Sequence, residues 1–248
     1  MRILKFSALL FLREFFESVY LLRRHMFTLP WLDVFFWFSF RYFLRSPHAV
    51  ARRWLRRNNL DLNTFNHSFV YGETPLRTWD LLIRRVGIKK GDVVFDVGCG
   101  SGKSCFFLSR RLQSRAVGIE YNEDFTTRAE WIRKKVKASE VVFVRADARN
   151  IDYGDADVVY LFSTTFTLEL MQALALRFRQ TLVYGAIVIS VSVPLQPKSI
   201  FQPVDEFPAP YFFGRCIVYV HRFIGEKIAT SPTVVEGDFF QLLESKKD

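Results

Sequence analysis

The chain has 248 residues, half of them hydrophobic, with a formal net charge of +10 and 27 phenylalanines. This composition excludes a disordered protein and fits one domain with an extension. The three cysteines are few and odd in number, which argues against a disulfide framework. The four histidines show no spacing typical of metal ligands. We therefore expect a reducing compartment and no metal site.

The positive charge is concentrated in residues 1–60, which carry a net charge of +8. The chain is therefore divided into a basic, aromatic helical arm, residues 1–60, and a nearly neutral domain, residues 61–248. Apolar residues recur at three- and four-residue spacing from Leu4 to Leu22, which predicts an amphipathic helix that ends at Pro30. Two further helices are expected at 31–45 and 47–58.

The arm is interrupted by charges too often for a membrane span, and it lacks the cleavage site of a signal peptide. Aromatic residues on one helix face and arginines on the other are typical of a helix that lies in the lipid interface. The same helices could cap the domain instead, and the two interpretations are compatible. We expect a cytoplasmic protein with peripheral contact to the inner membrane face through residues 1–58. Nucleic acid is the less favoured partner.

From about residue 71 the chain alternates between strand-like and helix-like segments. This alternation predicts a Rossmann-like α/β fold, a mostly parallel seven-stranded sheet with helices on both faces. Strands are expected at 92–96, 115–120, 141–145, 156–162, 185–193 and 216–223, and helices at 76–86, 103–112, 123–136 and 166–182. The proline-rich run 194–210 is expected to form an irregular, substrate-facing loop.

A glycine-rich run, Asp96-Val97-Gly98-Cys99-Gly100-Ser101-Gly102, follows an apolar strand and opens a helix. Such a turn lets a ligand approach the backbone near the N–H groups of the helix. Glu120 ends the next strand, where a carboxylate can accept hydrogen bonds from ribose hydroxyls, and Asp147 follows the strand after that, beside the expected adenine. The pattern predicts a site for S-adenosyl-L-methionine (SAM). Its expected residues are Asp96, Gly98, Cys99, Gly100, Gly102, Lys103, Glu120, Asp147 and Ala148.

Over roughly residues 65–225 these motifs resemble the class I SAM-dependent methyltransferases. Val70-Tyr71-Gly72-Glu73-Thr74 is similar to the cofactor-loop signature of the non-SET, telomeric-silencing type of histone-lysine methyltransferases. Gly118-Ile119-Glu120 and Arg145-Ala146-Asp147 are similar to the acidic motifs of that family. The resemblance implies that Tyr71, Gly72, Glu73 and Thr74 lie over the cofactor, and that a protein lysine amine is the acceptor.

The resemblance fails after the fourth strand of the domain, where that family has Asn-Asn-Phe and this chain has Phe162-Ser163-Thr164. Histone-type specificity is therefore not implied. A looser resemblance links the chain to small mitochondrial lysine methyltransferases that modify membrane-embedded or membrane-associated proteins, which also carry a hydrophobic N-terminal segment.

No catalytic residue is identified from the sequence. Phe162 and Ser163 are the candidates for a substrate channel, because they follow the fourth strand at the cofactor edge of the sheet. Further aromatic residues are available for its walls: Tyr71, Phe166, Tyr211, Phe212 and Phe213. A lipid, quinone or other small apolar acceptor stays open as an alternative, as do an RNA methyltransferase and a SAM-binding module without catalysis.

Overall fold

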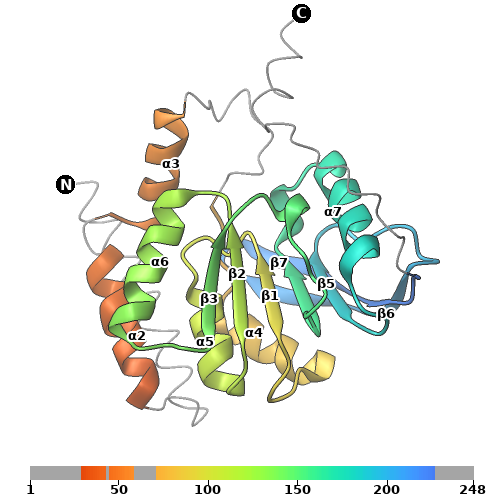
Figure 1. The fold of residues 1–248 in the computed structure, drawn as a ribbon, viewed down its shortest axis with the longest axis horizontal. Coiled ribbons are helices and arrows are strands. Elements are labelled where there is room, and N and C mark those ends of the chain that lie inside the picture. The colour runs from red at the N-terminus through yellow and green to blue at the C-terminus, as the bar shows by residue number, and fades with distance from the viewer. Residues whose placement is uncertain (1–28, 43–44, 59–70, 227–248) are drawn as a thin grey trace, which may run out of the picture.

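The computed structural model describes residues 29–42, 45–58 and 71–226 (Figure 1). The helices are α2 (Leu29–Tyr42), α3 (Pro47–Arg57), α4 (Leu76–Leu82), α5 (Lys103–Leu112), α6 (Glu123–Lys135) and α7 (Leu168–Thr181). The strands are β1 (Val94–Val97), β2 (Ala116–Glu120), β3 (Val141–Arg145), β4 (Val158–Leu161), β5 (Ile187–Val191), β6 (Phe201–Tyr211) and β7 (Gly214–Phe223). The expected helix from Leu4 to Leu22 lies outside the described residues.

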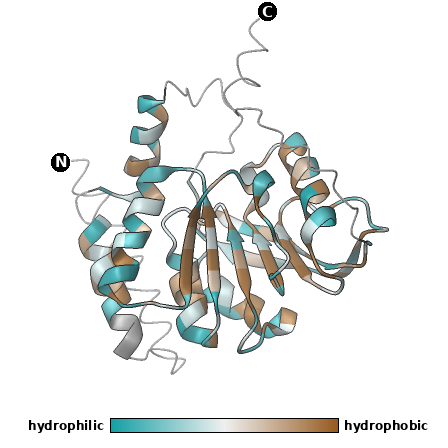
Figure 2. Cartoon of the chain, in the orientation of Figure 1, coloured by the Kyte–Doolittle hydropathy of each residue, from teal (hydrophilic) through white to brown (hydrophobic). Residues whose placement is uncertain are grey.

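The strands form one seven-stranded sheet in the order β3-β2-β1-β4-β5-β7-β6. The first five strands of that order are parallel, and β7 runs antiparallel between β5 and β6. Every residue of β1 and β4 is buried, because helices cover both faces of the sheet. Figure 2 shows the central part of the sheet as mostly hydrophobic. The predicted fold class is confirmed.

Strand order reverses between β1 and β4, so the segments that follow these two strands diverge to opposite sides. In open α/β sheets the ligand crevice lies at such a switch point, beyond the carboxyl ends of the strands. The glycine-rich run follows β1 and the Phe162 segment follows β4. The fold therefore brings both predicted functional segments to the same edge of the sheet.

The prediction for the proline-rich run was wrong, because most of this run is strand β6 rather than an irregular loop. Pro203, Pro208 and Pro210 lie within β6, which pairs only with β7 at the edge of the sheet. Proline has no N–H to donate to a ladder, but an edge strand has one side without a partner strand and tolerates it. The alternation of exposed and buried residues from Phe207 to Tyr211 marks the strand.

The described part of the arm packs against the domain. Val34, Phe38 and Tyr42 of α2 are buried in the same hydrophobic cluster as Val50 and Ala51 of α3, Val94 of β1 and the apolar residues of α5. Figure 1 shows α2 and α3 along one side of the domain, next to α6. Pro30 lies in the first turn of α2, which begins at Leu29 rather than at the expected residue 31. In the described parts of the chain, no helix is long and apolar enough to span a membrane.

Candidate cofactor and acceptor site

The glycine-rich run lies across the carboxyl ends of β1 and β2. The backbone N–H groups of Gly98 and Cys99 donate to the carbonyl oxygen of Ile119 at 2.8 and 3.0 Å, which draws the turn over the end of β2. Gly100 has a φ of +52°, a conformation that side chains rarely adopt, and a Cβ there would come within 2.8 Å of the Tyr71 ring. The turn therefore needs a glycine at this position for both its backbone and its contact.

Glu120 is held at the end of β2 by the same turn. One carboxylate oxygen, Oε2, accepts from the N–H of Gly100 at 2.8 Å, and the other, Oε1, accepts from the N–H of Asn122 at 2.7 Å. Burial raises the pKa of Glu120, and these backbone hydrogen bonds oppose that rise. The carboxylate is thus fixed in orientation and retains acceptor capacity for the two hydroxyls of a ribose.

Asp96 is buried in β1, only 4% exposed, on the same side as Glu120. Burial raises the pKa of Asp96 to about 7, with a further contribution from the charge of Glu120. A buried carboxyl whose pKa lies near neutrality is frequent in functional sites.

A polar network joins the segment Tyr71–Thr74 to the glycine-rich run. The Tyr71 hydroxyl bonds to the Glu73 carboxylate and lies 2.9 Å from the hydroxyl of Ser101, which in turn donates to Glu73 at 3.1 Å. Lys103 Nζ lies 3.8 Å from Glu73 Oε2, and both side chains are at least nine-tenths buried. Thr74 contacts the Tyr160 hydroxyl of β4 at 2.5 Å. These contacts fasten the predicted cofactor loop over the ends of β1 and β4.

Asp147 has a partner that the sequence did not reveal. Its carboxylate accepts from the side chain of Arg149, with Nη2 at 2.5 Å from Oδ2, and from the Arg149 backbone N–H at 2.9 Å. Next to it, the Ala148 carbonyl accepts from the Tyr153 hydroxyl at 2.8 Å. The Asp147 side chain is 17% exposed, so it can still meet an adenine amine while Arg149 holds its orientation.

The Phe162 ring belongs to an aromatic cluster with two residues of the β6–β7 hairpin. Phe162 stacks on Tyr211 at 5.3 Å between ring centroids, and Phe213 lies 6.1 Å from Phe162 and 6.0 Å from Tyr211. Phe213 is 62% exposed, so the cluster runs from the cofactor loop to the surface. Ser163 lies outside it: this side chain is fully buried, and its hydroxyl donates to the carbonyl of Val191 at 2.7 Å.

Cys99 and Cys105 pack rather than react. Both thiols are buried against Gly118, and a Cβ on Gly118 would come within 2.6 Å of the Cys99 sulfur and 2.9 Å of the Cys105 sulfur. The hydrogen bond with the Cys105 thiol raises the pKa of the Cys99 thiol, and burial and neighbouring carboxylates raise it further, which disfavours a nucleophilic thiolate. Among the residues that the structure describes, no group of three or more His, Cys, Asp or Glu side chains could hold a metal.

These residues fit SAM. The glycine turn leaves the backbone accessible, Glu120 offers a fixed carboxylate for the ribose, and Asp147 offers one for the adenine. The residues expected from the sequence at the methionine end, Tyr71 and Glu73, lie on the same glycine turn. The sequence did not point to Ser101, Arg149 or Tyr160 as participants, because each is identified only by its partner in space.

A family model described as the ANTKMT methyltransferase domain matches residues 96–199. A sterol 24-C-methyltransferase from Eremothecium gossypii is 36% identical over 87 residues, which cover 34% of this chain and 23% of that protein. A histone-lysine N-methyltransferase specific for H3 lysine-79, from Dictyostelium discoideum, is 26% identical over 159 residues, 57% of this chain and 8% of that protein. The chain thus spans less than a quarter of the length of these curated relatives.

Among solved structures, an RNA methyltransferase from Salinibacter ruber in complex with S-adenosyl-L-homocysteine is similar over 63% of this chain and 96% of that one. Its sequence identity is 26% and its TM-score is 0.51. The strand order, the glycine turn with its two acidic partners and the family match agree with one another. The chain is therefore similar to the class I SAM-dependent methyltransferases, and SAM is the cofactor that fits this site.

Proposed function

We propose that this protein transfers the methyl group of SAM to a protein amine, with a lysine side chain as the acceptor. The observation that carries the proposal is the aromatic cluster of Phe162, Tyr211 and Phe213, which runs from the cofactor loop to the surface. Aromatic faces attract an ammonium group, and an apolar channel favours its neutral, nucleophilic form. The similarity to the H3 lysine-79 methyltransferase supports the same acceptor class.

Methyl transfer from a sulfonium needs alignment and exclusion of water more than acid–base chemistry. SAM supplies the activated methyl group. Glu120 and Asp147 would orient the nucleoside, and the network of Tyr71, Glu73 and Ser101 would hold the loop closed over it. Phe162 would exclude water from the acceptor amine, whose proton leaves to solvent when the amine is desolvated.

The proposal does not extend to histones. The segment after β4 is Phe162-Ser163-Thr164, and Ser163 is buried in a bond to Val191 rather than available to a substrate. Recognition of the peptide around the lysine must therefore come from other surfaces. The exposed tip of the β6–β7 hairpin, with Phe212 and Phe213, is the nearest candidate.

We also propose that the arm places the enzyme on a membrane. Phe36 and Phe40 of α2 are 58% and 62% exposed, and they adjoin Trp37 and Trp131. Lys135 lies over both tryptophan rings, at 5.3 and 5.5 Å. Exposed aromatic rings with neighbouring cations suit the headgroup level of an anionic bilayer. Helix α3 supplies further cations to the arm, because a groove on it is lined by Arg52, Arg53, Arg56 and Arg57.

The test is transfer of label from methyl-labelled SAM into a lysate that contains membranes, followed by counting of soluble protein, membrane protein, lipid and RNA fractions. The control is Glu120→Ala, which removes the ribose carboxylate. Label in a discrete protein band that the control loses, and methyl-lysine by mass spectrometry, support the proposal. Label in lipid alone would favour the second candidate, a small apolar acceptor, which the sterol methyltransferase similarity supports. Label in RNA alone would overturn both.

A further inference from the structure

Helix α3 contacts both edges of the cofactor site. At its start, the His48 ring meets the ring of Tyr71 edge-on, with 5.1 Å between centroids. Near its end, Trp54 meets Tyr121 edge-on at 5.9 Å. Tyr71 belongs to the cofactor loop, and Tyr121 directly follows the ribose carboxylate Glu120. The arm therefore bridges the two loops between which SAM binds.

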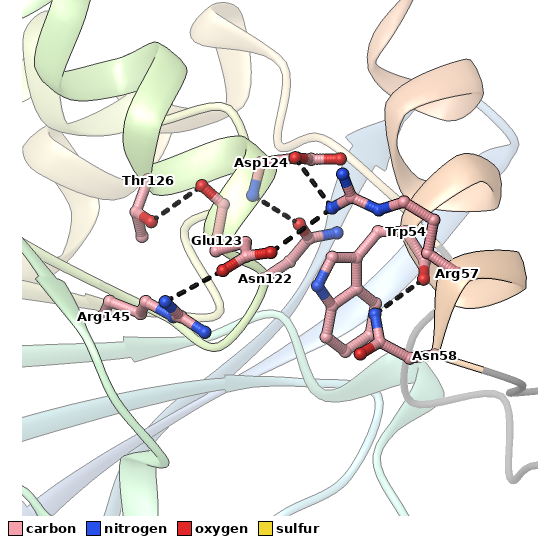
Figure 3. A network of polar contacts seen from close by, with 8 residues as sticks. All are labelled: Trp54, Arg57, Asn58, Asn122, Glu123, Asp124, Thr126 and Arg145. Atoms are coloured by element: carbon pink, nitrogen blue, oxygen red, sulfur yellow. Dashed lines mark hydrogen bonds and ion pairs between the residues drawn. The ribbon is translucent and has the colours of Figure 1, made fainter.

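Figure 3 shows how the far end of α3 is fastened. Arg57 donates to Glu123 Oε1 at 3.3 Å and to Asp124 Oδ1 at 3.0 Å, in the first turn of α6. Asn122 caps that turn by accepting from the N–H of Asp124 at 2.9 Å, and its own N–H donates to Glu120. Through Arg57, the arm therefore bonds to the segment that follows Glu120 and holds its carboxylate.

Tyr42, the last residue of α2, has a buried hydroxyl group that points to a specific role for the arm. Its ring is buried beside Phe38, with 4.8 Å between centroids, and its hydroxyl is buried without a hydrogen-bond partner among the described residues. Arg128 lies over this ring, with 5.5 Å from its guanidinium carbon to the ring centroid, and the carboxylate of Glu73 in the cofactor loop also acts on the hydroxyl. Burial raises the pKa of Tyr42, so the hydroxyl stays protonated and is a donor that lacks an acceptor.

A buried donor without an acceptor is costly, and a bound ligand is one way in which a native structure satisfies it. We propose that the arm completes the cofactor site: Tyr42 donates a hydrogen bond to the methionine end of SAM, and α3 is the wall that holds the two cofactor loops together. The inference concerns cofactor binding alone and stands whatever the acceptor is.

Tyr42→Phe is the direct test, because it removes one oxygen and keeps the buried ring. Isothermal titration with S-adenosyl-L-homocysteine is expected to show about tenfold weaker binding, the scale of one hydrogen bond to a charged group. The free protein should unfold at the same temperature as the wild type or higher, since an unsatisfied hydroxyl is lost. Tyr184→Phe, at a site 76% exposed, is the matched control and should bind normally.

The role of α3 is tested with two arginines, Arg57 and Arg145, that share Glu123 as a partner. Only Arg57 belongs to the arm. We expect Arg57→Ala to weaken binding of S-adenosyl-L-homocysteine by a few fold and Arg145→Ala to leave it unchanged. In the wild type, the ligand should slow amide hydrogen exchange across residues 45–58. Normal binding by Tyr42→Phe would overturn the role of Tyr42, and unchanged exchange in α3 would overturn the role of the wall.

Discussion

The Phe162 ring lies against Gly72 so closely that a Cβ on Gly72 would come within 2.5 Å of Phe162 Cε1. We therefore expect Gly72→Ala to displace the cofactor loop or the ring, at a cost of about 1–3 kcal/mol in the free energy of unfolding. Affinity for S-adenosyl-L-homocysteine and the rate of methyl transfer should both fall. Thermal unfolding, titration and the label assay measure these effects.

The smaller side chain of Phe162→Leu should make room for the added methyl group. The double variant Gly72→Ala/Phe162→Leu is therefore expected to regain cofactor affinity relative to Gly72→Ala alone. A double variant as weak as the single one would show that the contact with the Phe162 ring does not cause the loss.

Glu120→Ala should weaken binding of S-adenosyl-L-homocysteine at least tenfold and leave the circular dichroism spectrum unchanged. The variant removes the ribose acceptor and also frees the N–H groups of Gly100 and Asn122. Glu120→Gln keeps the shape and one acceptor oxygen, so its affinity should lie between those of the wild type and the alanine variant. Wild-type affinity in the alanine variant would contradict the assigned role.

Asp96 makes the stability of the cofactor-free protein depend on pH. Its pKa rises from about 3.8 when unfolded to about 7 when folded. The protonated form therefore favours folding, and that contribution is complete below about pH 3.8 and lost as the pH rises to about 7. A tenfold difference in proton affinity between the folded and unfolded states corresponds to about 1.4 kcal/mol. Urea unfolding should show lower stability at pH 8 than at pH 5, with a smaller difference in Asp96→Asn.

Two further variants check the assignment of this pH effect. The pKa of Glu120 is also raised, so the double variant Asp96→Asn/Glu120→Gln should flatten the dependence further. Asp205 has a lowered pKa because it bonds to Arg85, so Asp205→Asn should not flatten it. An unchanged pH dependence in Asp96→Asn would show that other groups cause it.

Phe213→Ala should raise the KM for the protein acceptor several fold without changing the affinity for S-adenosyl-L-homocysteine. The ring is 62% exposed and forms the surface end of the aromatic cluster that we propose as the acceptor channel. Phe212→Ala is the neighbouring control, at a ring 39% exposed, and should have the smaller effect. Equal effects of both variants would assign the role to the hairpin tip as a whole.

Local motifs were enough to predict which residues meet at the carboxyl edge of the sheet. Asp96, Gly98 and Glu120 were identifiable because each follows or ends an apolar strand, and parallel strands bring such ends to one edge of the sheet. The bounds of α5 and β3 were predicted to the residue. The bounds of these elements are set by hydrophobic patterns and turn residues that lie close together in the sequence.

Features set by distant contacts were not predictable. Prolines argued against a strand at β6, and only its place at the edge of the sheet makes them acceptable. Trp54 contacts Tyr121, and Arg57 bonds to Glu123 and Asp124, which follow it by 66 and 67 positions in the sequence. Contacts over such separations produce no periodic pattern in the sequence. The arm could therefore be recognised as aromatic and basic, but not as a neighbour of Tyr71 and Tyr121.

The order of synthesis gives the packing of α3 a kinetic consequence. Trp54 leaves the ribosome well before Tyr121, whose ring it contacts in the folded protein, and before the first turn of α6, to which Arg57 of the same helix bonds. At roughly 5–20 residues per second, the aromatic face of the arm stays uncovered for several seconds in every nascent chain. During that interval the arm is open to chaperones and to bilayers, and its attachment to the domain waits for translation of α6.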